Sequence, residues 1–286
     1  MPQEREIATR IVSLSELREI VAAIRAIAVS QMQQALQSLD AIRHYSSAVH
    51  EALSDAAKMM PVEITLSPPA ELSKFGLIVF CAEHGLCGAF NEHPLRVAES
   101  ALAEKNQRLA LIVVGSRGSQ ICRERGLTPD LVVPMATHCA GATATARRLA
   151  AEVYAMLSDG RIAGLEVIYV RHMENESTRI ERDRLLPLEI PSVERQAMPI
   201  LPLVNLPPRR LFDDIAAEYL FAALENATMQ SFFSENSTRF RIMEAAHQNI
   251  ESKTGELTKL ARRLRQEAVT TEILDLISGA EALAVR

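Results

Sequence analysis

The sequence contains no tryptophan and few other aromatic residues. Among 286 residues there are eight Phe and four Tyr. Platforms that stack nucleic-acid bases and aromatic-rich β-sandwiches depend on such rings, so both classes are disfavoured. Basic residues are not in excess either: 31 Lys and Arg face 36 Asp and Glu, a formal net charge of −5. Because nucleic-acid-binding proteins usually have a strongly basic balance, we expect no nucleic-acid partner.

Long apolar runs are also missing. The longest, FGLIVFCA at 75–82, is far shorter than the roughly 18 residues that span a bilayer, so we expect no direct span. The first residues lack the pattern of a secretory signal, and we expect neither secretion nor a transit peptide. Four cysteines are too few for a disulfide framework in a chain of this length, and we expect free thiols in a reducing compartment. They are Cys81, Cys87, Cys122 and Cys139.

Proline is confined almost entirely to the middle of the chain. None occurs between Pro2 and Pro61 or after Pro208, and beyond Pro208 the only glycines are Gly255 and Gly279. Since proline breaks helices and both residues mark loops, this distribution predicts a helix, a globular middle and a second helix. The predicted segments are an N-terminal coiled-coil helix at 1–60, an αβ domain ending in a Pro-rich linker at 61–208, and a C-terminal coiled-coil helix at 209–286.

Both terminal segments have the apolar periodicity of coiled-coil helices. In the first, every seventh position is apolar: Ile7, Leu14, Val21, Ala28, Ala35, Ile42 and Val49. In the second, the stripe includes Met229, Phe233, Phe240, Met243, Ile250, Leu257, Leu264 and Leu274. At 1.5 Å per residue, unbroken helices would be roughly 80 and 110 Å long. We expect them to bury their stripes on each other as a long antiparallel coiled coil, with the tip of the longer helix unaccompanied.

The middle segment alternates between predicted strands and predicted helices. Apolar strands are predicted at 75–82, 109–114, 131–133 and 165–171, with 179–188 pairing with the last of them. Helices are predicted at 91–104, 117–125 and 143–157. Continuous apolar strands separated by helices are typical of a parallel sheet covered on both faces. The fold class is therefore α/β: the long coiled coil plus a small, mostly parallel, Rossmann-like αβ domain.

Residue patterns that could support catalysis or ligand binding are weak. Gly115-Ser-Arg-Gly118 follows a strand and opens a helix, where a phosphate could bind, but the chain has neither a G-x-G-x-x-G nor a P-loop pattern. We interpret it as a tight structural turn. Cys87 beside His84 has no acid–base partners for nucleophilic catalysis, and the His and Cys spacings fit no zinc motif. We therefore expect no catalytic residue, no cofactor and no metal.

A basic block lies late in the C-terminal helix. It consists of Lys259, Arg262, Arg263 and Arg265. It is either a solvated face or a collar that meets an acidic partner, and these readings have similar weight. The segment 268–285 that follows contains no Lys or Arg and is largely apolar, so we expect a partner to cover it. Membrane binding is the weaker alternative, since no basic face accompanies the apolar residues.

Four segments, in order, resemble the gamma subunit of F-type ATP synthases over nearly the whole chain. They are IATRIVSLSELREIVAAIRAIAVSQM at 7–32, EHGLCGAFN at 83–91, SENSTRFRIMEAAHQN at 234–249 and RQEAVTTEILDLISGAEAL at 265–283. The resemblance implies a central rotor shaft that couples ion flow, such as hydrogen ion transport, to ATP synthesis or hydrolysis at sites on other subunits. The implied partners are three alpha and three beta subunits, the epsilon subunit and the membrane c-ring. The implied location is peripheral, at the cytoplasmic face of a bacterial inner membrane, and the chain itself is a non-catalytic subunit.

The resemblance also implies which residues contact partners. With the basic block included, the predicted partner-interface residues are Arg25, Gln31, Met32, Glu83, Gly85, Leu86, Cys87, Gly88, Lys259, Arg262, Arg263, Arg265, Gln266, Thr270 and Glu272. Further matches to the family pattern are Ser234, Glu235, Arg239, Met243 and Asn249. Departures from it, such as Gln31 in place of a lysine and Arg25 where many members have Glu, suggest a divergent paralogue from an alternative F-type operon.

Two other functions remain open at the level of sequence. One is an αβ nucleotide-binding protein or enzyme with a coiled-coil dimerisation arm, which the turn at 115–118 motivates. The other is a coiled-coil adaptor without a motor role, which predicts a symmetric homodimer.

Overall fold

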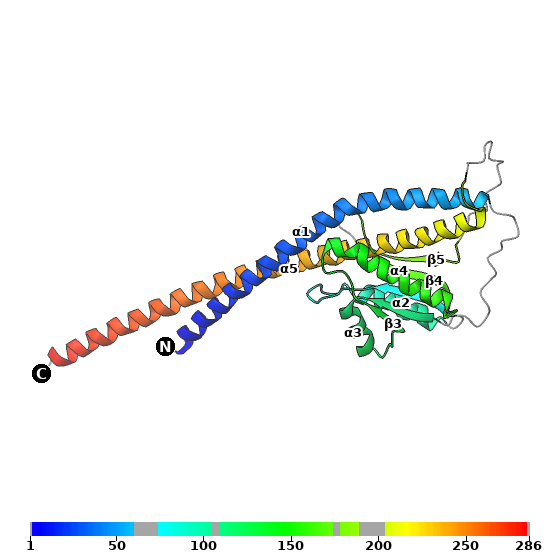
Figure 1. The fold of residues 1–286 in the computed structure, drawn as a ribbon. Coiled ribbons are helices and arrows are strands. Elements are labelled where there is room, and N and C mark those ends of the chain that lie inside the picture. The colour runs from blue at the N-terminus through cyan, green and yellow to red at the C-terminus, as the bar shows by residue number, and fades with distance from the viewer. Residues whose placement is uncertain (1, 60–73, 105–108, 174–177, 189–203, 285–286) are drawn as a thin grey trace. The chain divides into compact units, whose positions relative to one another are not determined.

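The computed structural model describes residues 2–59, 74–104, 109–173, 178–188 and 204–284 (Figure 1). By its internal contacts the chain forms two compact units. The first combines Met1–Ala28 with Phe240–Arg286, and the second is Val29–Arg239. The division into three functional segments at 60 and 208 stays a prediction.

The two long terminal helices are confirmed. Helix α1 covers Pro2–Lys58 and helix α5 covers Pro208–Ala284, each without interruption (Figure 1). Proline is absent from the interior of both, so every interior residue can donate its backbone N–H to the helix. Helix α5 continues through Gly255, where an added Cβ atom would meet nothing within 4 Å.

The second unit contains a five-stranded sheet in the order β3-β2-β1-β4-β5. Strands β1 to β4 are parallel, and β5 pairs antiparallel with β4. The strands are β1 at Lys74–Phe80, β2 at Leu109–Val114, β3 at Leu131–Val133, β4 at Ile162–His172 and β5 at Thr178–Leu186. The mostly parallel sheet predicted from the apolar runs is therefore confirmed, including the pairing of its last two strands.

Short helices connect these strands. They are α2 at Glu92–Ala103, α3 at Ser116–Glu124 and α4 at Ala142–Ser158, the last preceded by a 3-10 turn η1 at Cys139–Gly141. Each helix lies within two residues of its predicted bounds. The strand–helix alternation thus gives a Rossmann-like arrangement, in which each parallel crossover passes over one face of the sheet.

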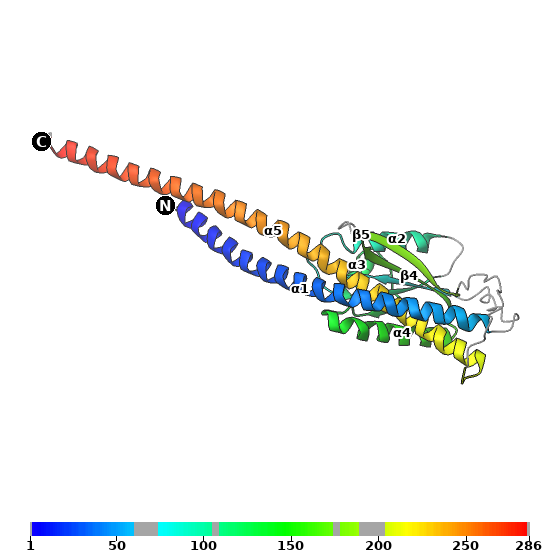
Figure 2. The ribbon, with the colours of Figure 1, turned by 90° about the horizontal axis from the view of Figure 1, so that it is seen from above.

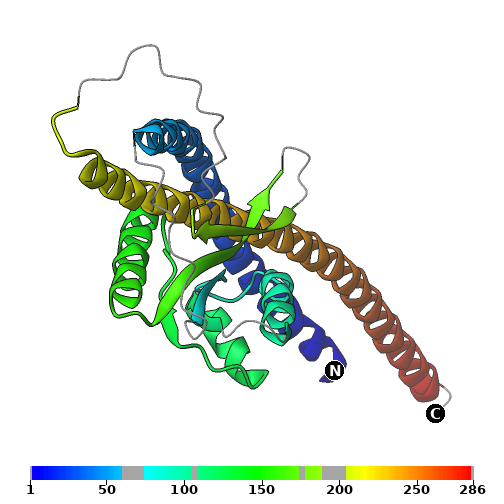
Figure 3. The ribbon, with the colours of Figure 1, turned by 90° about the vertical axis from the view of Figure 1, so that its right-hand side faces the viewer.

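Alternate residues of the central strands supply two separate cores, because side chains of a strand point to opposite faces. On one face, Leu77 and Val79 of β1 pack with residues of α2 and α3. On the other, Ile78 and Phe80 pack with α4 and with the parts of α1 and α5 that belong to this unit. Figure 3 shows α4 and α2 on opposite sides of the sheet. The long helices therefore serve as one layer of the αβ domain.

Helices α1 and α5 run antiparallel within the second unit (Figure 2). Tyr45 of α1 donates a hydrogen bond to Glu218 of α5, and further along, Leu53 of α1 shares an apolar cluster with Phe212. In the first unit the same two helices are joined by an ion pair of Arg25 and Glu244, described below. The expected antiparallel pairing is confirmed.

Candidate functional site

In Rossmann-like folds, ligands bind at the carboxyl ends of the strands, where the turn at 115–118 opens α3. Here the carboxylate of Glu83, just after β1, fills that place. It accepts hydrogen bonds from the backbone N–H of Ser116 at 3.0 Å, from the Ser116 hydroxyl at 2.6 Å and from the backbone N–H of Met135 at 2.8 Å. Burial by itself raises the pKa of Glu83, but the hydrogen bonds from Ser116 and Met135 outweigh it and lower the pKa. The chain's own carboxylate occupies the position an anion would take.

The glycines of that turn are needed for close packing. Gly115 has φ +112°, and a Cβ atom there would lie 2.4 Å from the Cys81 carbonyl oxygen. A Cβ atom on Gly118 would lie 2.1 Å from the Cβ atom of Cys81. Both glycines let α3 approach the end of β1. These contacts support the interpretation of the motif as a structural turn.

The predicted interface turn at 83–91 is stabilised by an internal hydrogen bond and exposes the apolar side chain of Leu86. The Asn91 side-chain oxygen accepts the backbone N–H of Ala82 at 2.8 Å. Leu86, at φ 62°, is 59% exposed, whereas Cys87 is buried. Burial, aided by the charge of Glu235, raises the pKa of Cys87 to about 11. Since the thiolate is the reactive form, a nucleophilic role for Cys87 is disfavoured at neutral pH.

Helix α5 is fastened to this end of the sheet by a set of polar contacts that we call the clasp, formed by Ser234, Glu235 and Arg239 with Gly85 and Val170. The Ser234 hydroxyl donates to the Val170 carbonyl oxygen at 2.9 Å. Arg239 donates to the Gly85 carbonyl oxygen at 3.4 Å and forms an ion pair with Glu235. The side chains of Arg239 and Glu235 are 13% and 5% exposed, so the pair is shielded from water.

Glu235 supplies the carboxyl group of the clasp, and the pKa of this group lies well above its ordinary value. Burial raises its pKa to about 7, although the charge and hydrogen bond of Arg239 act in the opposite direction. Its Oε2 atom is buried without a hydrogen-bond partner among the described residues. A carboxyl in such surroundings changes its charge near neutral pH.

Gln31 and Met32, predicted to contact partners, lie in the second unit and make internal contacts. The Gln31 side-chain oxygen accepts the backbone N–H of Cys139 at 2.8 Å. Met32 is partly buried against the core that contains α4 and α5. Their contact with a partner subunit stays a prediction.

The predicted interface residues of the turn at 83–88 also lie in the second unit, and the remaining ones, Arg25 and those from Lys259 onward, lie in the first unit. Arg25 forms an ion pair with Glu244 of α5 at 2.7 Å, and about a third of each side chain is exposed. The basic residues Lys259, Arg262 and Arg265 are exposed. Arg263 is also exposed and lies 3.5 Å from Glu267. Arg25 is therefore built into the helix pair, whereas the basic block faces outward.

The signature after the basic block is exposed as well. Gln266, Thr270 and Glu272 lie on the surface of α5, and the Thr270 hydroxyl donates to the Gln266 carbonyl oxygen at 2.8 Å. Apolar side chains in the same stretch are about half exposed or more: Val269, Ile273, Leu274, Leu276 and Ile277. Exposed apolar surfaces of this kind are typical of partner-binding sites, and partner contact at this stretch stays a prediction.

The part of the chain that the structure describes contains no group of three or more His, Cys, Asp or Glu side chains arranged to hold a metal ion. The four cysteines are buried and unbridged. Within the same residues, no helix has the length and apolarity needed to cross a membrane.

Sequence reasoning matched Glu83 and Glu235 to a family pattern but missed their structural roles. A signal for Glu83 was present: it follows one buried strand directly, and the turn at 115–118 follows another. The carboxyl ends of neighbouring parallel strands meet at one edge, so these residues had to lie close together. For Glu235 no comparable signal exists, because its burial depends on where α5 crosses the sheet.

Two long helices at the ends of the chain, combined with a small Rossmann-like domain whose usual ligand position is filled by the Glu83 carboxylate, define a coiled-coil protein with an αβ domain. The family model described as ATP synthase matches residues 3–283. The chain belongs to this family.

Relatives match over almost their full lengths. The ATP synthase gamma chain of Micrococcus luteus is 29% identical, with 96% of both chains covered. That of Pelotomaculum thermopropionicum is 27% identical, with 99% of this chain and 100% of the relative covered. Among solved structures, a chain of the Euglena gracilis mitochondrial ATP synthase (OSCP/F1/c-ring, rotational state 3) has a TM-score of 0.68 at 15% identity, covering 99% of this chain and 95% of that chain. At that identity the similarity is one of fold.

Proposed function

We propose that this chain is the gamma subunit of an F-type ATP synthase and acts as its central rotor shaft. The observation that carries the proposal is the family match over residues 3–283, together with full-length relatives that are themselves gamma chains. The two uninterrupted helices and the closed ligand position of the αβ domain support it. A shaft needs a stiff element and a foot, and it needs no active site of its own.

In this function the partners do the chemistry. Three alpha and three beta subunits surround the helices, and the αβ domain sits with the epsilon subunit on the membrane c-ring. Ion flow through that ring turns the shaft, and the shaft presents a different side to each beta subunit in turn. Each beta conformation is favoured by its own set of contacts, which is how one rotating element biases three sites. The chain itself is held at the membrane peripherally, at the cytoplasmic face of a bacterial inner membrane.

The clasp is the joint through which torque passes between α5 and the αβ domain. It holds α5 to two strand ends by hydrogen bonds from Ser234 and Arg239. Polar contacts with defined directions resist sliding and rotation better than apolar packing does, because displacement leaves the donors and acceptors unpaired.

The exposed part of α5 is the proposed contact with the alpha and beta ring. It begins with the basic block, which consists of Lys259, Arg262, Arg263 and Arg265. The block is followed by the exposed apolar residues and by Gln266, Thr270 and Glu272. The turn around Leu86 is the proposed contact of the foot. The three segments 1–60, 61–208 and 209–286 are then the first shaft helix, the foot and the second shaft helix.

Purification of the complex from native membranes tests this function. A tag on an exposed residue of the αβ domain, followed by mass spectrometry of the intact complex, should recover one copy of this chain with three copies each of two larger subunits. Recovery of the chain alone or as a homodimer would contradict the rotor function and favour the adaptor.

A further inference from the structure

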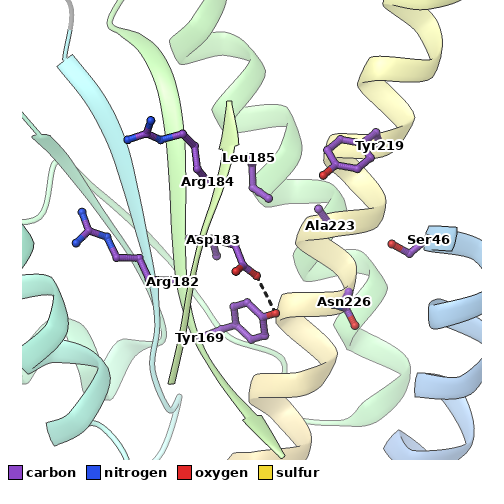
Figure 4. Close-up of a pocket in the computed structure, with 10 residues that line it drawn as sticks. Ser46, Tyr169, Arg182, Asp183, Arg184, Leu185, Tyr219, Ala223 and Asn226 are labelled. Atoms are coloured by element: carbon purple, nitrogen blue, oxygen red, sulfur yellow. Dashed lines mark hydrogen bonds between the residues drawn. The ribbon is translucent and has the colours of Figure 1, made fainter. Parts of the chain in front are cut away.

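The second unit contains an open cavity of about 530 Å³ that the proposed function leaves unused. It lies between β5 and the helices that cover this face of the sheet (Figure 4). The side chains that give it its chemistry come from four elements: Tyr169 on β4, Asp183 on β5, Tyr219 and Asn226 on α5, and Ser46 on α1. None of them belongs to the clasp or to the predicted partner-interface residues.

Among the described residues that line the cavity, Asp183 is the acidic one, and its side chain points toward Tyr169 (Figure 4). Asp183 accepts a hydrogen bond from the Tyr169 hydroxyl at 3.0 Å (Figure 4). Arg182 and Arg184 also line the cavity, but their side chains point away from it, toward the opposite face of the sheet (Figure 4). There they bind Glu166 at 2.8 and 3.0 Å. The charge that faces the cavity is therefore that of Asp183.

The other polar side chains of the wall, those of Asn226, Tyr219 and Ser46, each carry an oxygen atom able to accept hydrogen bonds. The Asn226 side-chain oxygen is buried and has no partner among the described residues. Tyr219 and Ser46 add hydroxyl groups. Burial, together with the neighbouring Asp183, raises the pKa of Tyr169, so this phenol stays neutral. An unpaired buried acceptor costs free energy that a donor from a ligand would recover.

We propose that this cavity binds a small organic cation with a primary ammonium group, of the aliphatic diamine or polyamine class. An ammonium group has three N–H donors and no acceptor, which suits Asp183 and the Asn226 oxygen. The faces of aromatic rings attract cations, and two such rings, those of Tyr169 and Tyr219, line the cavity. Apolar wall residues such as Leu185 take the methylene groups, and the volume is within the range of about 300–1,000 Å³ typical of small-molecule sites.

The amino-acid composition of the chain allows binding in the cavity to be measured by tyrosine fluorescence. There is no Trp, and two of the four Tyr residues line the cavity, so tyrosine fluorescence reports on its occupancy. The full chain is titrated with spermidine at low ionic strength, and the heat of binding is measured in parallel. We expect a saturable fluorescence change and a matching binding isotherm.

Two charge-matched variants distinguish binding of spermidine in the cavity from nonspecific attraction of spermidine to the acidic surface of the protein. Asp183→Asn and Asp214→Asn each change the formal net charge from −5 to −4, but Asp214 is exposed on α5 and does not line the cavity. Asp183→Asn should weaken binding by about tenfold or more, since it removes a charge-assisted hydrogen bond. Asp214→Asn should bind as the parent does. Equal loss in both variants, or no saturable binding by the parent chain, would overturn the proposal.

A further variant controls for structural damage. Asn226→Leu keeps a similar volume and removes the unpaired oxygen, so it should weaken spermidine binding while leaving the thermal unfolding temperature the same or higher. Unchanged binding by this variant would contradict the assigned geometry.

A lysine side chain of a partner subunit could supply the same ammonium chemistry. In that case spermidine binds the isolated chain but not the assembled complex, and a zero-length carboxyl-to-amine cross-linker joins Asp183 to that lysine. Binding in both preparations identifies a free amine instead.

Discussion

Arg239, on α5, donates a hydrogen bond to the Gly85 carbonyl oxygen at 3.4 Å and, through the same guanidinium, pairs with the buried carboxylate of Glu235. One side chain thereby connects a residue of the long helix to the turn that follows β1. The position is the strand-end crevice that related folds use for ligands. In this chain the crevice is used instead to hold the helix against the sheet.

Removal of Arg239 should destabilise the αβ domain. In Arg239→Ala, Glu235 and the Gly85 carbonyl oxygen lose the hydrogen bonds that Arg239 donates, and Glu235 takes up a proton instead of staying charged, so the change should cost about 1–3 kcal/mol of unfolding free energy. Urea unfolding followed by circular dichroism measures the loss. As a control, Arg209→Ala removes an exposed pair with Asp213 and should cost less than about 1 kcal/mol. Similar midpoints for both variants would show that the clasp contributes little to stability.

The pKa of Glu235 makes stability depend on pH. Its value in the folded protein, about 7, is higher than the ordinary 4.5, so the folded state binds the proton more tightly than the unfolded state. This carboxyl therefore costs stability progressively as pH rises from about 4.5 to about 7, and the cost is complete above that window. The difference of about 2.5 units corresponds to about 3 kcal/mol. Its charged or titratable neighbours are Arg239, Glu83, Cys81 and Cys87.

Glu235→Gln tests this dependence because glutamine cannot ionise. Relative to the parent, the variant should gain about 2–3 kcal/mol of unfolding free energy between pH 5 and pH 8. Denaturant unfolding at several pH values measures the trend. Glu152→Gln, on the exposed side of α4, should show a constant difference from the parent. If the Glu235→Gln difference is equally flat, the carboxyl does not titrate in this window.

Glu83 should act as an internal replacement for a bound anion. In Glu83→Ala, the backbone N–H groups of Ser116 and Met135 lose their acceptor, which should cost about 1–3 kcal/mol and open an anion position at the start of α3. Inorganic phosphate should then raise the unfolding temperature of the variant, measured against chloride at equal ionic strength.

The matched control is Glu83→Gln, which retains an acceptor oxygen and should respond to phosphate as weakly as the parent. Calorimetric titration of the parent chain with ATP should give no heat of binding up to near-millimolar ligand. Saturable ATP binding by the parent would revive the nucleotide-binding alternative, since it would show that Glu83 does not close the site.

Arg265 and Gln266 should affect coupling without affecting the fold. Both are exposed on α5, so the double change Arg265→Ala with Gln266→Ala should leave the unfolding temperature within about 1 °C of the parent. ATP hydrolysis and synthesis rates in the assembled complex should both fall. The double change Ser252→Ala with Lys253→Ala, exposed elsewhere on α5, is the control. Parent-like rates in the Arg265 and Gln266 variant would remove these residues from the proposed interface.

The secondary structure followed from the sequence because its signals are local. The absence of proline between Pro2 and Pro61, and the apolar repeat from Ile7 to Val49, mark a long helix whatever the rest of the chain does. Apolar runs such as 109–114 are long enough for buried strands and too short for helices. The family could likewise be recognised from short segments in a fixed order.

Contacts between distant segments were decided only by the tertiary structure. Gln31 as the acceptor for Cys139, Glu83 as the cap of α3, and the orientation of Asp183 and Tyr219 toward one cavity each join residues far apart in the chain. Periodicity tells which face of an element is buried, but it does not tell which element covers that face. Burial is also what moves the pKa of Glu235 to about 7, and burial is a property of the packed domain rather than of the residue.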